Sequence, residues 1–184
     1  MQLTPTDIPA VKLLTPKKFG DNRGFFSETF NQKTFRDLVG ADVDFVQDNQ
    51  SLSVEKGVVR GLHYQLPPMA QDKLVRVTRG AILDVAVDIR RGSPTFGKHV
   101  AAVISAENWR QIFIPVGFAH GFVTLEPNTE VVYKVSNYYS PRDERGILWN
   151  DAALRIDWGI DASAAVTSEK DRKYPTLAAA TDLL

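Results

Sequence analysis

The sequence predicts an all-β fold, a jelly-roll sandwich or barrel with a few short peripheral helices. Short segments that alternate apolar and polar residues recur along most of the chain, which is the pattern of half-buried strands. Gly, Pro, Asn and Asp separate these segments, and no long helical periods alternate with them as they would in a βαβ fold. Many short strands in a chain of this size favour a sandwich or barrel, and a jelly roll can leave a cavity for a ligand.

The elements follow this pattern in order along the chain. The strand patterns lie at 24–30, 44–53, 58–66, 73–80, 81–89, 110–117 and 130–139. One short helix is predicted at 31–39, where Asn31 can cap the N-terminus and Phe35, Leu38 and Val39 share a face. From Asp161 the chain is richer in Ala and charged residues, which predicts irregular or short helical structure packed on the sheet.

Bulk properties narrow the class of protein. At 184 residues and 43% hydrophobic composition, we expect one domain that spans 1–184. The 22 basic and 22 acidic residues cancel, so no overall charge draws the chain to nucleic acid or to an anionic membrane. The chain has no cysteine, which excludes disulfides and cysteine metal sites. No segment has the pattern of a signal peptide or a membrane span, so we expect a cytoplasmic protein.

Strand parity directs several polar side chains to one side. Residues two apart on a strand point the same way, so His63 points with Gln65, while Lys73 and Tyr133 each point with apolar neighbours. If these faces line one cavity, each polar group needs a partner or a ligand. The pattern therefore predicts a site inside the barrel.

Two spacings resemble the motifs of metal-binding cupins, with the metal ligands changed. Residues 57–65, followed by Lys73 and Gly80, resemble the first motif, and residues 115–120 resemble the second. Gln65 stands where the cupin motif has its second His, and Lys73 stands where it has Glu. Because an ammonium group cannot ligate a cation and repels it, we predict a cupin-type jelly roll without a metal ion.

The inward residues suit proton transfer beside a ketone. Such chemistry needs a base for the carbon, a cation or donor at the oxygen where the enolate forms, and an acid on the opposite face. His63 is the natural base near neutral pH, Lys73 supplies the charge, and Tyr133 can return the proton. A further carboxylate that orients the His would improve the base.

Long motif strings extend this pattern over nearly the whole chain. They include DNRGFFSE (21–28), QDN (47–49), GVVRGLHYQLPP (57–68), DKLVR (72–76), DVAVDIRRGSPTFG (84–97), PVGFAHGF (115–122), YK (133–134), YYSP (138–141), WND (149–151) and SEKD (168–171). Through them the chain closely resembles the dTDP-4-dehydrorhamnose 3,5-epimerase family. The resemblance implies a homodimeric jelly roll, without a cofactor, that inverts C3 and C5 of dTDP-4-dehydro-6-deoxy-α-D-glucose. The product, dTDP-4-dehydro-β-L-rhamnose, leads to dTDP-L-rhamnose.

The resemblance also implies a role for individual residues. His63 becomes the proton acceptor with Asp171 as its dyad partner, Tyr133 becomes the proton donor, and Lys73 contacts the keto oxygen of the sugar. The implied substrate contacts are His120 at the sugar, Arg23 and Arg60 at the diphosphate, Glu28, Gln47 and Asn49 at the nucleotide end, Tyr139 stacked on thymine, and the further positions Glu144 and Lys170.

Some residues are left outside this set. His99 matches no motif, and we assign it to the surface. Asp84 and Asp88 flank apolar residues at strand parity, and their spacing suits a solvent-facing or structural role. The Asp-Ala-Ala at 151–153 replaces an Asp-Pro that the family pattern has after Trp149 and Asn150, outside the expected chemistry.

The sequence is also compatible with other roles for these residues and other functions for the chain. Lys73 could extend its ammonium group to the rim of the barrel, and Tyr133 could simply fill the core. The chain as a whole could be an epimerase acting at one carbon, a ketoisomerase, a non-catalytic nucleotide-sugar binding module or a metal-dependent cupin dioxygenase. Retention of His63, Asp171, Lys73 and Tyr133 together favours the double epimerase, because a binding module gains nothing from an acid and a base facing each other.

Overall fold

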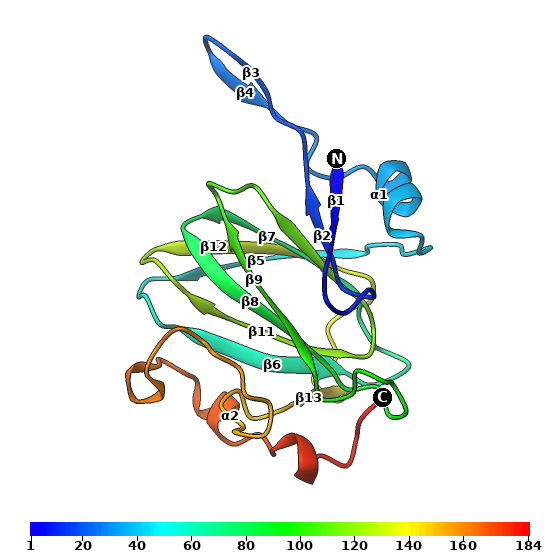
Figure 1. Ribbon diagram of the computed structural model, residues 1–184, viewed down its shortest axis with the longest axis vertical. Helices are drawn as coiled ribbons and strands as arrows, with labels where there is room; N and C mark the ends of the chain where they lie inside the picture. Colours follow the sequence, from blue (N-terminus) through cyan, green and yellow to red (C-terminus); the bar gives the residue numbers. More distant parts are fainter.

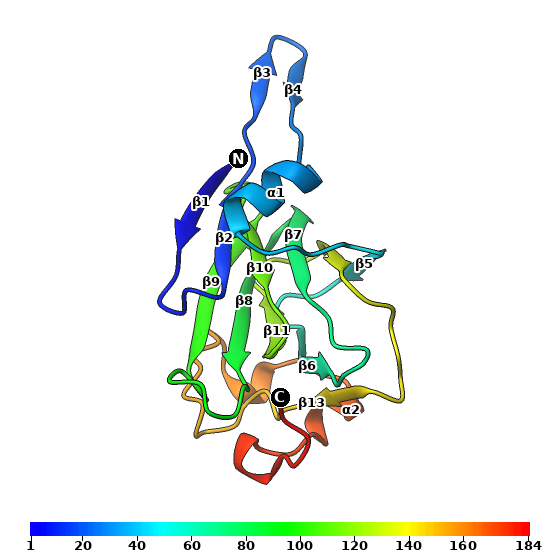
Figure 2. The same cartoon turned by 90° about the vertical axis from the view of Figure 1, so that its right-hand side faces the viewer.

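The computed structural model describes residues 1–184, and most of the regular secondary structure of the chain is β-strand (Figure 1). Six strands form one sheet in the order β1-β2-β10-β7-β12-β5, and five form a second sheet in the order β13-β6-β11-β8-β9. A separate hairpin, β3-β4, projects from one end of the molecule (Figures 1 and 2). The predicted jelly roll is confirmed.

The sheets are built from strands of three to eight residues. The strands are β1 (Gln2–Pro5), β2 (Lys12–Thr15), β3 (Phe19–Asp21), β4 (Gly24–Phe26), β5 (Gln47–Ser53), β6 (Val59–Gln65), β7 (Lys73–Arg79), β8 (Ala81–Asp88), β9 (His99–Ser105), β10 (Gln111–Ile114), β11 (Phe118–Thr124), β12 (Thr129–Val135) and β13 (Glu144–Gly146). The helical pieces are α1 (Gln32–Val39), η1 (Ala162–Ala164), α2 (Glu169–Arg172) and η2 (Leu177–Ala179). No helix in the chain is both long enough and apolar enough to cross a bilayer.

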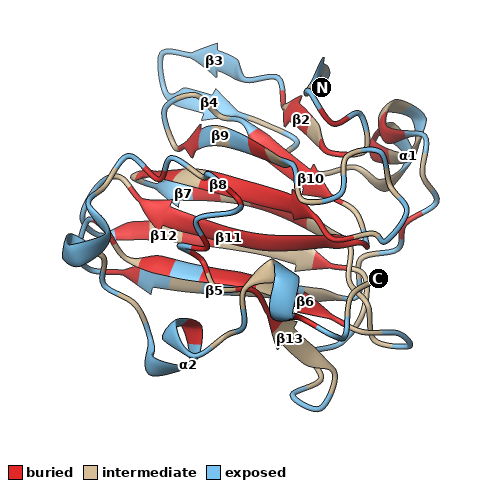
Figure 3. Cartoon of the chain, turned by 60° about the horizontal axis from the view of Figure 1, so that its bottom comes forward, coloured by how far each residue is buried: buried red, intermediate tan, exposed pale blue.

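Alternation along the strands divides the buried residues between two sides of the five-stranded sheet. One core cluster lies between the sheets, with Ile82 and Ala86 of β8 facing Val75 of β7. Val85 and Val87, which have the opposite parity on β8, pack against the segment after β13, including Trp149 and Trp158. Figure 3 shows this buried centre along β8 and β11. As predicted, the C-terminal segment is irregular or briefly helical and covers the outer face of this sheet.

The predicted helix is confirmed as α1. The Asn31 side chain accepts a hydrogen bond from the backbone N–H of Thr34 at 3.0 Å, and the helix ends at Gly40, whose φ of 71° is left-handed. Phe35 is fully buried against Phe113 of β10, whereas Leu38 is only half-buried. The helix therefore covers the outer face of the six-stranded sheet.

The projecting hairpin differs from the strand predicted at 24–30. Only Gly24–Phe26 is a strand, and it pairs with β3 rather than with either main sheet. Phe25 packs edge to face against the Trp109 ring, with ring centroids 5.1 Å apart. Phe19, Phe25 and Phe26 nevertheless remain 54%, 57% and 69% exposed, so the hairpin buries little of its apolar surface on this chain. Its alternating pattern therefore does not lead to a core strand.

Candidate active site

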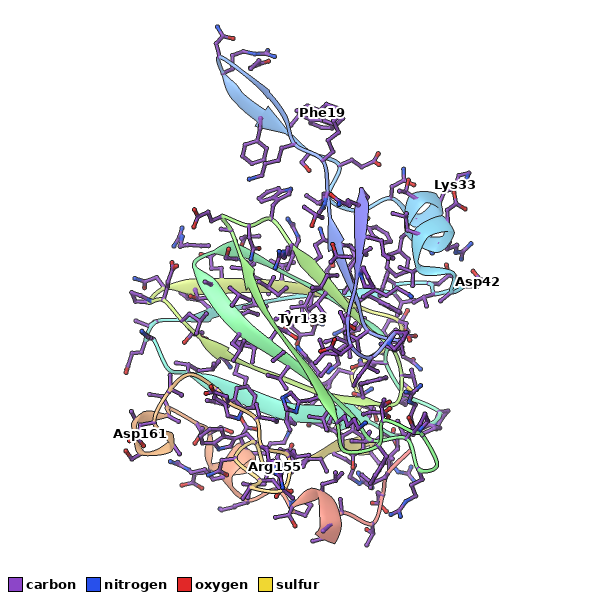
Figure 4. All side chains as sticks on the ribbon, viewed as in Figure 1. Phe19, Lys33, Asp42, Tyr133, Arg155 and Asp161 are labelled. Atoms are coloured by element: carbon purple, nitrogen blue, oxygen red, sulfur yellow. The ribbon has the colours of Figure 1, made fainter.

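Two adjoining hollows lie between the sheets and meet at three of the predicted residues. They measure about 110 Å³ and 270 Å³, and His63, Lys73 and Tyr133 line both. Figure 4 shows Tyr133 between the two layers of strands. Another hollow, of about 300 Å³, lies over the outward side chains Leu74 and Arg76, but it holds no histidine and no His–carboxylate pair. The chemistry therefore belongs to the interior.

Strand register brings the site residues together from both sheets. On the five-stranded side, His63 of β6 lies directly opposite His120 of β11. A Cβ atom on Gly61 would come within 2.5 Å of the His120 carbonyl oxygen, so only glycine allows this close approach of the two strands. On the six-stranded side, β7 and β12 pair antiparallel and carry Lys73 and Tyr133 on their inward faces. The parity prediction is confirmed for these residues.

His63 forms the expected pair with Asp171. Its Nε2 lies 2.6 Å from Asp171 Oδ1, across 108 positions of sequence. Asp171 stands in α2, where its backbone N–H donates to the side chain of Ser168, and it is buried. Burial alone would raise the pKa of Asp171, but the hydrogen bond and charge of His63 hold that pKa below its ordinary value. A carboxylate on Nε2 leaves Nδ1 as the nitrogen free to accept a proton from a ligand.

Lys73 has no hydrogen bond or ion pair with any protein group, although it lies in the interior. Burial lowers its pKa from 10.5 to about 8, against the opposing negative charges of Asp84 and then Glu144. An ammonium with so few partners interacts strongly with any oxygen that gains negative charge beside it.

Tyr133 is placed to donate a proton. Its hydroxyl group makes no hydrogen bond within the chain, and burial raises its pKa above the ordinary value, opposed by the charge of Arg60. At neutral pH the hydroxyl therefore keeps its proton. The alternative in which Tyr133 only fills the core fits poorly with a half-buried side chain that lines both hollows.

The smaller hollow is rimmed by a connected polar group. The Tyr139 hydroxyl donates to Glu144 at 2.9 Å, and Lys170 forms an ion pair with the same carboxylate. Although burial raises the pKa of Glu144, these two partners lower it overall. Gln47 accepts from the backbone N–H of Tyr139 and donates to Asn49 at 2.8 Å. The Tyr139 side chain, 54% exposed, offers a free ring face for stacking.

The larger hollow carries an exposed cation and a second histidine. Arg60 donates to the side chain of Ser53 and to the Leu52 carbonyl, both at 3.3 Å, which fixes its guanidinium group at the mouth. His120 is buried, and its Nε2 lies 2.8 Å from Asp84 Oδ2.

Two predicted substrate contacts lie away from this site. Arg23 sits at the turn of the β3-β4 hairpin, paired with Asp21 at 2.6 Å, and Glu28 is exposed in the segment that follows the hairpin. Neither residue lines either hollow, and the hairpin projects away from the barrel (Figures 1 and 2). The single chain therefore does not bring them to the other eleven.

The structure also bears on the predictions for three residues outside the set of site residues. Asp84 and Asp88 are fully buried, so the solvent-facing reading is wrong. Asp88 is structural, because it accepts hydrogen bonds from Arg90, Ser93 and Thr95. Asp84 instead lies beside the site, which the sequence reasoning missed; its shared parity with Ile82 and Ala86 was the available signal. His99 is half-buried on the edge strand β9, where burial lowers its pKa, rather than fully at the surface.

The positions that match cupin metal ligands are committed to other partners. Asp171 occupies Nε2 of His63, and Asp84 occupies Nε2 of His120. The Gln65 amide oxygen accepts from the backbone N–H of Ser140, and its nitrogen donates to the Met69 and Tyr138 carbonyls. No three His, Cys, Asp or Glu side chains gather to hold a metal ion. The donor set does not fit a resident divalent cation.

Comparisons with known proteins point to one enzyme family. The family model described as dTDP-4-dehydrorhamnose 3,5-epimerase matches residues 5–179. The chain is 56% identical over 171 residues to the dTDP-4-dehydrorhamnose 3,5-epimerase of Shigella flexneri, covering 93% of each chain. The dTDP-6-deoxy-D-glucose-3,5-epimerase of Legionella pneumophila, solved with dTDP-4-keto-L-rhamnose, superposes with a TM-score of 0.92 at 46% identity, covering 97% of this chain and 93% of that one.

A more distant solved relative differs in activity. The 3'-monoepimerase of Streptomyces bikiniensis, solved with dTDP-quinovose, has a TM-score of 0.88 and 34% identity, covering 95% of this chain and 87% of that one. The fold therefore supports both double and single epimerisation.

Proposed function

The chain belongs to the dTDP-4-dehydrorhamnose 3,5-epimerase family, and on that premise we propose that it inverts C3 and C5 of dTDP-4-dehydro-6-deoxy-α-D-glucose to give dTDP-4-dehydro-β-L-rhamnose. One observation carries the assignment of roles. The His63–Asp171 dyad shares its hollows with an unpaired Lys73 and an unpaired Tyr133.

The first half of the reaction uses the dyad and Lys73. Nδ1 of His63 removes the proton from the carbon next to the C4 ketone, and the electron pair of the C–H bond moves to the ketone oxygen. Asp171 stabilises the resulting imidazolium through Nε2–H. Lys73 stabilises the enolate oxygen, an effect that in comparable sites accounts for about 10²-fold to 10³-fold in rate.

The second half returns a proton to the opposite face. The enolate re-forms the ketone, and the carbon takes its proton from the Tyr133 hydroxyl, which leaves a phenolate until solvent and the imidazolium restore both groups. The same sequence at the second carbon completes the double inversion. Positioned acid–base groups of this kind contribute about 10²-fold to 10⁴-fold each.

The binding residues divide between the two hollows. Arg60 suits the diphosphate, because its guanidinium fork matches paired oxygens. Tyr139, with Gln47 and Asn49 beside it, suits the nucleotide base. Glu144 and Lys170 close the rim beside the sugar. We keep the cytoplasm as the proposed location, because a chain without cysteine needs no oxidising compartment to fold.

We also propose that the chain works as a homodimer in which Arg23 and Glu28 serve the partner's site. Two features support this proposal. The residues lie outside the hollows of their own chain, and the hairpin that carries Arg23 exposes three phenylalanines that a second copy could cover.

Proton NMR of the protein with dTDP-4-dehydro-6-deoxyglucose in deuterated water, with EDTA present, tests the activity. Deuterium at both C3 and C5, and dTDP-L-rhamnose when a suitable reductase is added, are the expected results. Exchange at one carbon alone would assign a single epimerase instead, and binding without exchange would assign a binding module.

Mixed dimers test the shared site. Arg23→Ala and His63→Ala chains, each of low activity alone, are refolded together. If Arg23 serves the partner, half of each mixed dimer regains an intact His63 and an intact Arg23, and activity returns. A mixture as inactive as its components would show that Arg23 does not act across the dimer.

A further inference from the structure

Asp84 is a buried carboxylate beside the site that the proposed mechanism does not use. It is fully buried on β8, on the inward face that it shares with Ile82 and Ala86. Its Oδ2 lies 2.8 Å from Nε2 of His120, and its Oδ1 is buried without any hydrogen-bond partner. A buried carboxylate with one oxygen that lacks a hydrogen-bond partner destabilises the fold, so its presence here calls for a functional explanation.

The geometry repeats the arrangement around the base. His63 and His120 lie opposite each other on neighbouring strands, and each presents Nε2 to its own buried carboxylate. The two carboxylates come from different elements, since Asp171 belongs to α2 and Asp84 to β8. Each carboxylate fixes the Nε2–H form of its histidine and leaves Nδ1 unprotonated when the ring is neutral.

Asp84 is also the largest influence that opposes the effect of burial on Lys73. Burial lowers the Lys73 pKa, and the charge of Asp84, ahead of Glu144 on β13, raises it. The other charged or titratable groups that line the hollows with Lys73 are Arg60, His63 and Tyr64 on β6, His120 on β11, Tyr133 on β12, Lys170 and Asp171 at α2, and Tyr139 before β13. Several of these groups are cations, so few other carboxylates inside the barrel can offset the effect of burial on Lys73 as Asp84 does.

We propose that Asp84 is a positioning residue for the epimerisation: it orients His120 toward the sugar through Nε2 and keeps Lys73 in its charged form beside the keto oxygen of the substrate. The proposal rests on the proposed function. Asp84 itself lines neither hollow and so acts through the two residues that do.

The variant Asp84→Asn removes the charge while an amide oxygen can still accept from His120. Deuterium incorporation should slow by about 10-fold to 100-fold, the range typical when a carboxylate that orients a functional histidine is lost. The alkaline limb of kcat against pH should move to lower pH, because Lys73 loses its proton more readily without the carboxylate. Carbon NMR of the Lys73 side chain should show its titration move in the same direction.

The matched control is Asp88→Asn, on the same strand and equally buried. Asp88 holds Arg90, Ser93 and Thr95 and lines neither hollow, so this variant should lose stability but keep the wild-type alkaline limb. A comparable movement of the limb in both variants would reduce Asp84 to a structural residue.

An unchanged alkaline limb and an unchanged Lys73 titration in Asp84→Asn would overturn the proposal. If that variant does not fold, nitrogen NMR of the wild-type protein decides: the proposal requires a proton on Nε2 of His120, and a neutral ring protonated only on Nδ1 contradicts it. Wild-type protein that fails to exchange deuterium at all would instead count against the proposed function.

Discussion

Replacing Lys73 by Met should make the protein more stable while it removes activity. The pKa of Lys73 lies at about 8 instead of 10.5, so the folded state disfavours the charged side chain. The difference of 10.5 minus 8, at about 1.36 kcal/mol per unit, corresponds to about 3 kcal/mol. Methionine has nearly the same length and carries no charge, so the variant avoids this penalty.

The sign of the pH dependence follows from the lowered pKa. Below about pH 8 the lysine is charged in both states, and the full penalty applies to the wild-type protein. Between about pH 8 and 10.5 the unfolded chain binds the proton more tightly than the folded one, so wild-type stability rises with pH. The advantage of Lys73→Met should therefore be greatest at pH 7 and shrink toward pH 10.

Urea unfolding of both proteins at pH 7 and pH 10 measures this difference. The exposed Lys98, which makes no side-chain ion pair, provides the control, and Lys98→Met should change stability by no more than about 0.5 kcal/mol at either pH. A Lys73→Met protein that is less stable than wild type at pH 7, or whose advantage is the same at both pH values, would refute the reasoning from buried charge.

Three further substitutions separate the proposed roles. His63→Ala should abolish deuterium exchange at both C3 and C5, because no other side chain is placed as the base; exchange that persists in the NMR assay would exclude His63. Tyr133→Phe should retain some exchange but form little inverted product, since abstraction needs only the base, and equal loss of both would count against Tyr133 as the acid. Arg60→Ala should raise KM more than it lowers kcat, because the guanidinium group binds the diphosphate; steady-state kinetics with an unchanged KM and a collapsed kcat would contradict that role.

The apolar core explains how the fold tolerates the energetic cost of charged Lys73 in its interior. A continuous apolar cluster on β7, β8, β11 and β12 surrounds the hollow. Its packing positions these strands without help from the polar side chains of the site. Strands paired within the two sheets carry His63, Lys73 and Tyr133, whereas the rim residue Tyr139 lies on a loop between β12 and β13. These three reacting groups are thus held more firmly than Tyr139.

The sequence alone determined the strand pattern, the inward direction of His63, Lys73 and Tyr133, and the helix capped by Asn31. These features depend on local periodicity and on capping, which act between residues that are neighbours in the chain. The motif strings identified the remaining site residues only through resemblance to a family. Strand parity alone predicts which face of the sheet a side chain points to, but it does not predict how deeply that side chain is buried or which group it contacts.

Only the tertiary structure decided which groups meet. The pairing of His63 with Asp171 joins residues 108 positions apart, and that of His120 with Asp84 joins residues 36 positions apart. The tertiary structure also buries Asp84 away from solvent and places Arg23 outside the site of its own chain. Such contacts depend on how the two sheets and the C-terminal segment pack together, and no local pattern of the sequence records that packing.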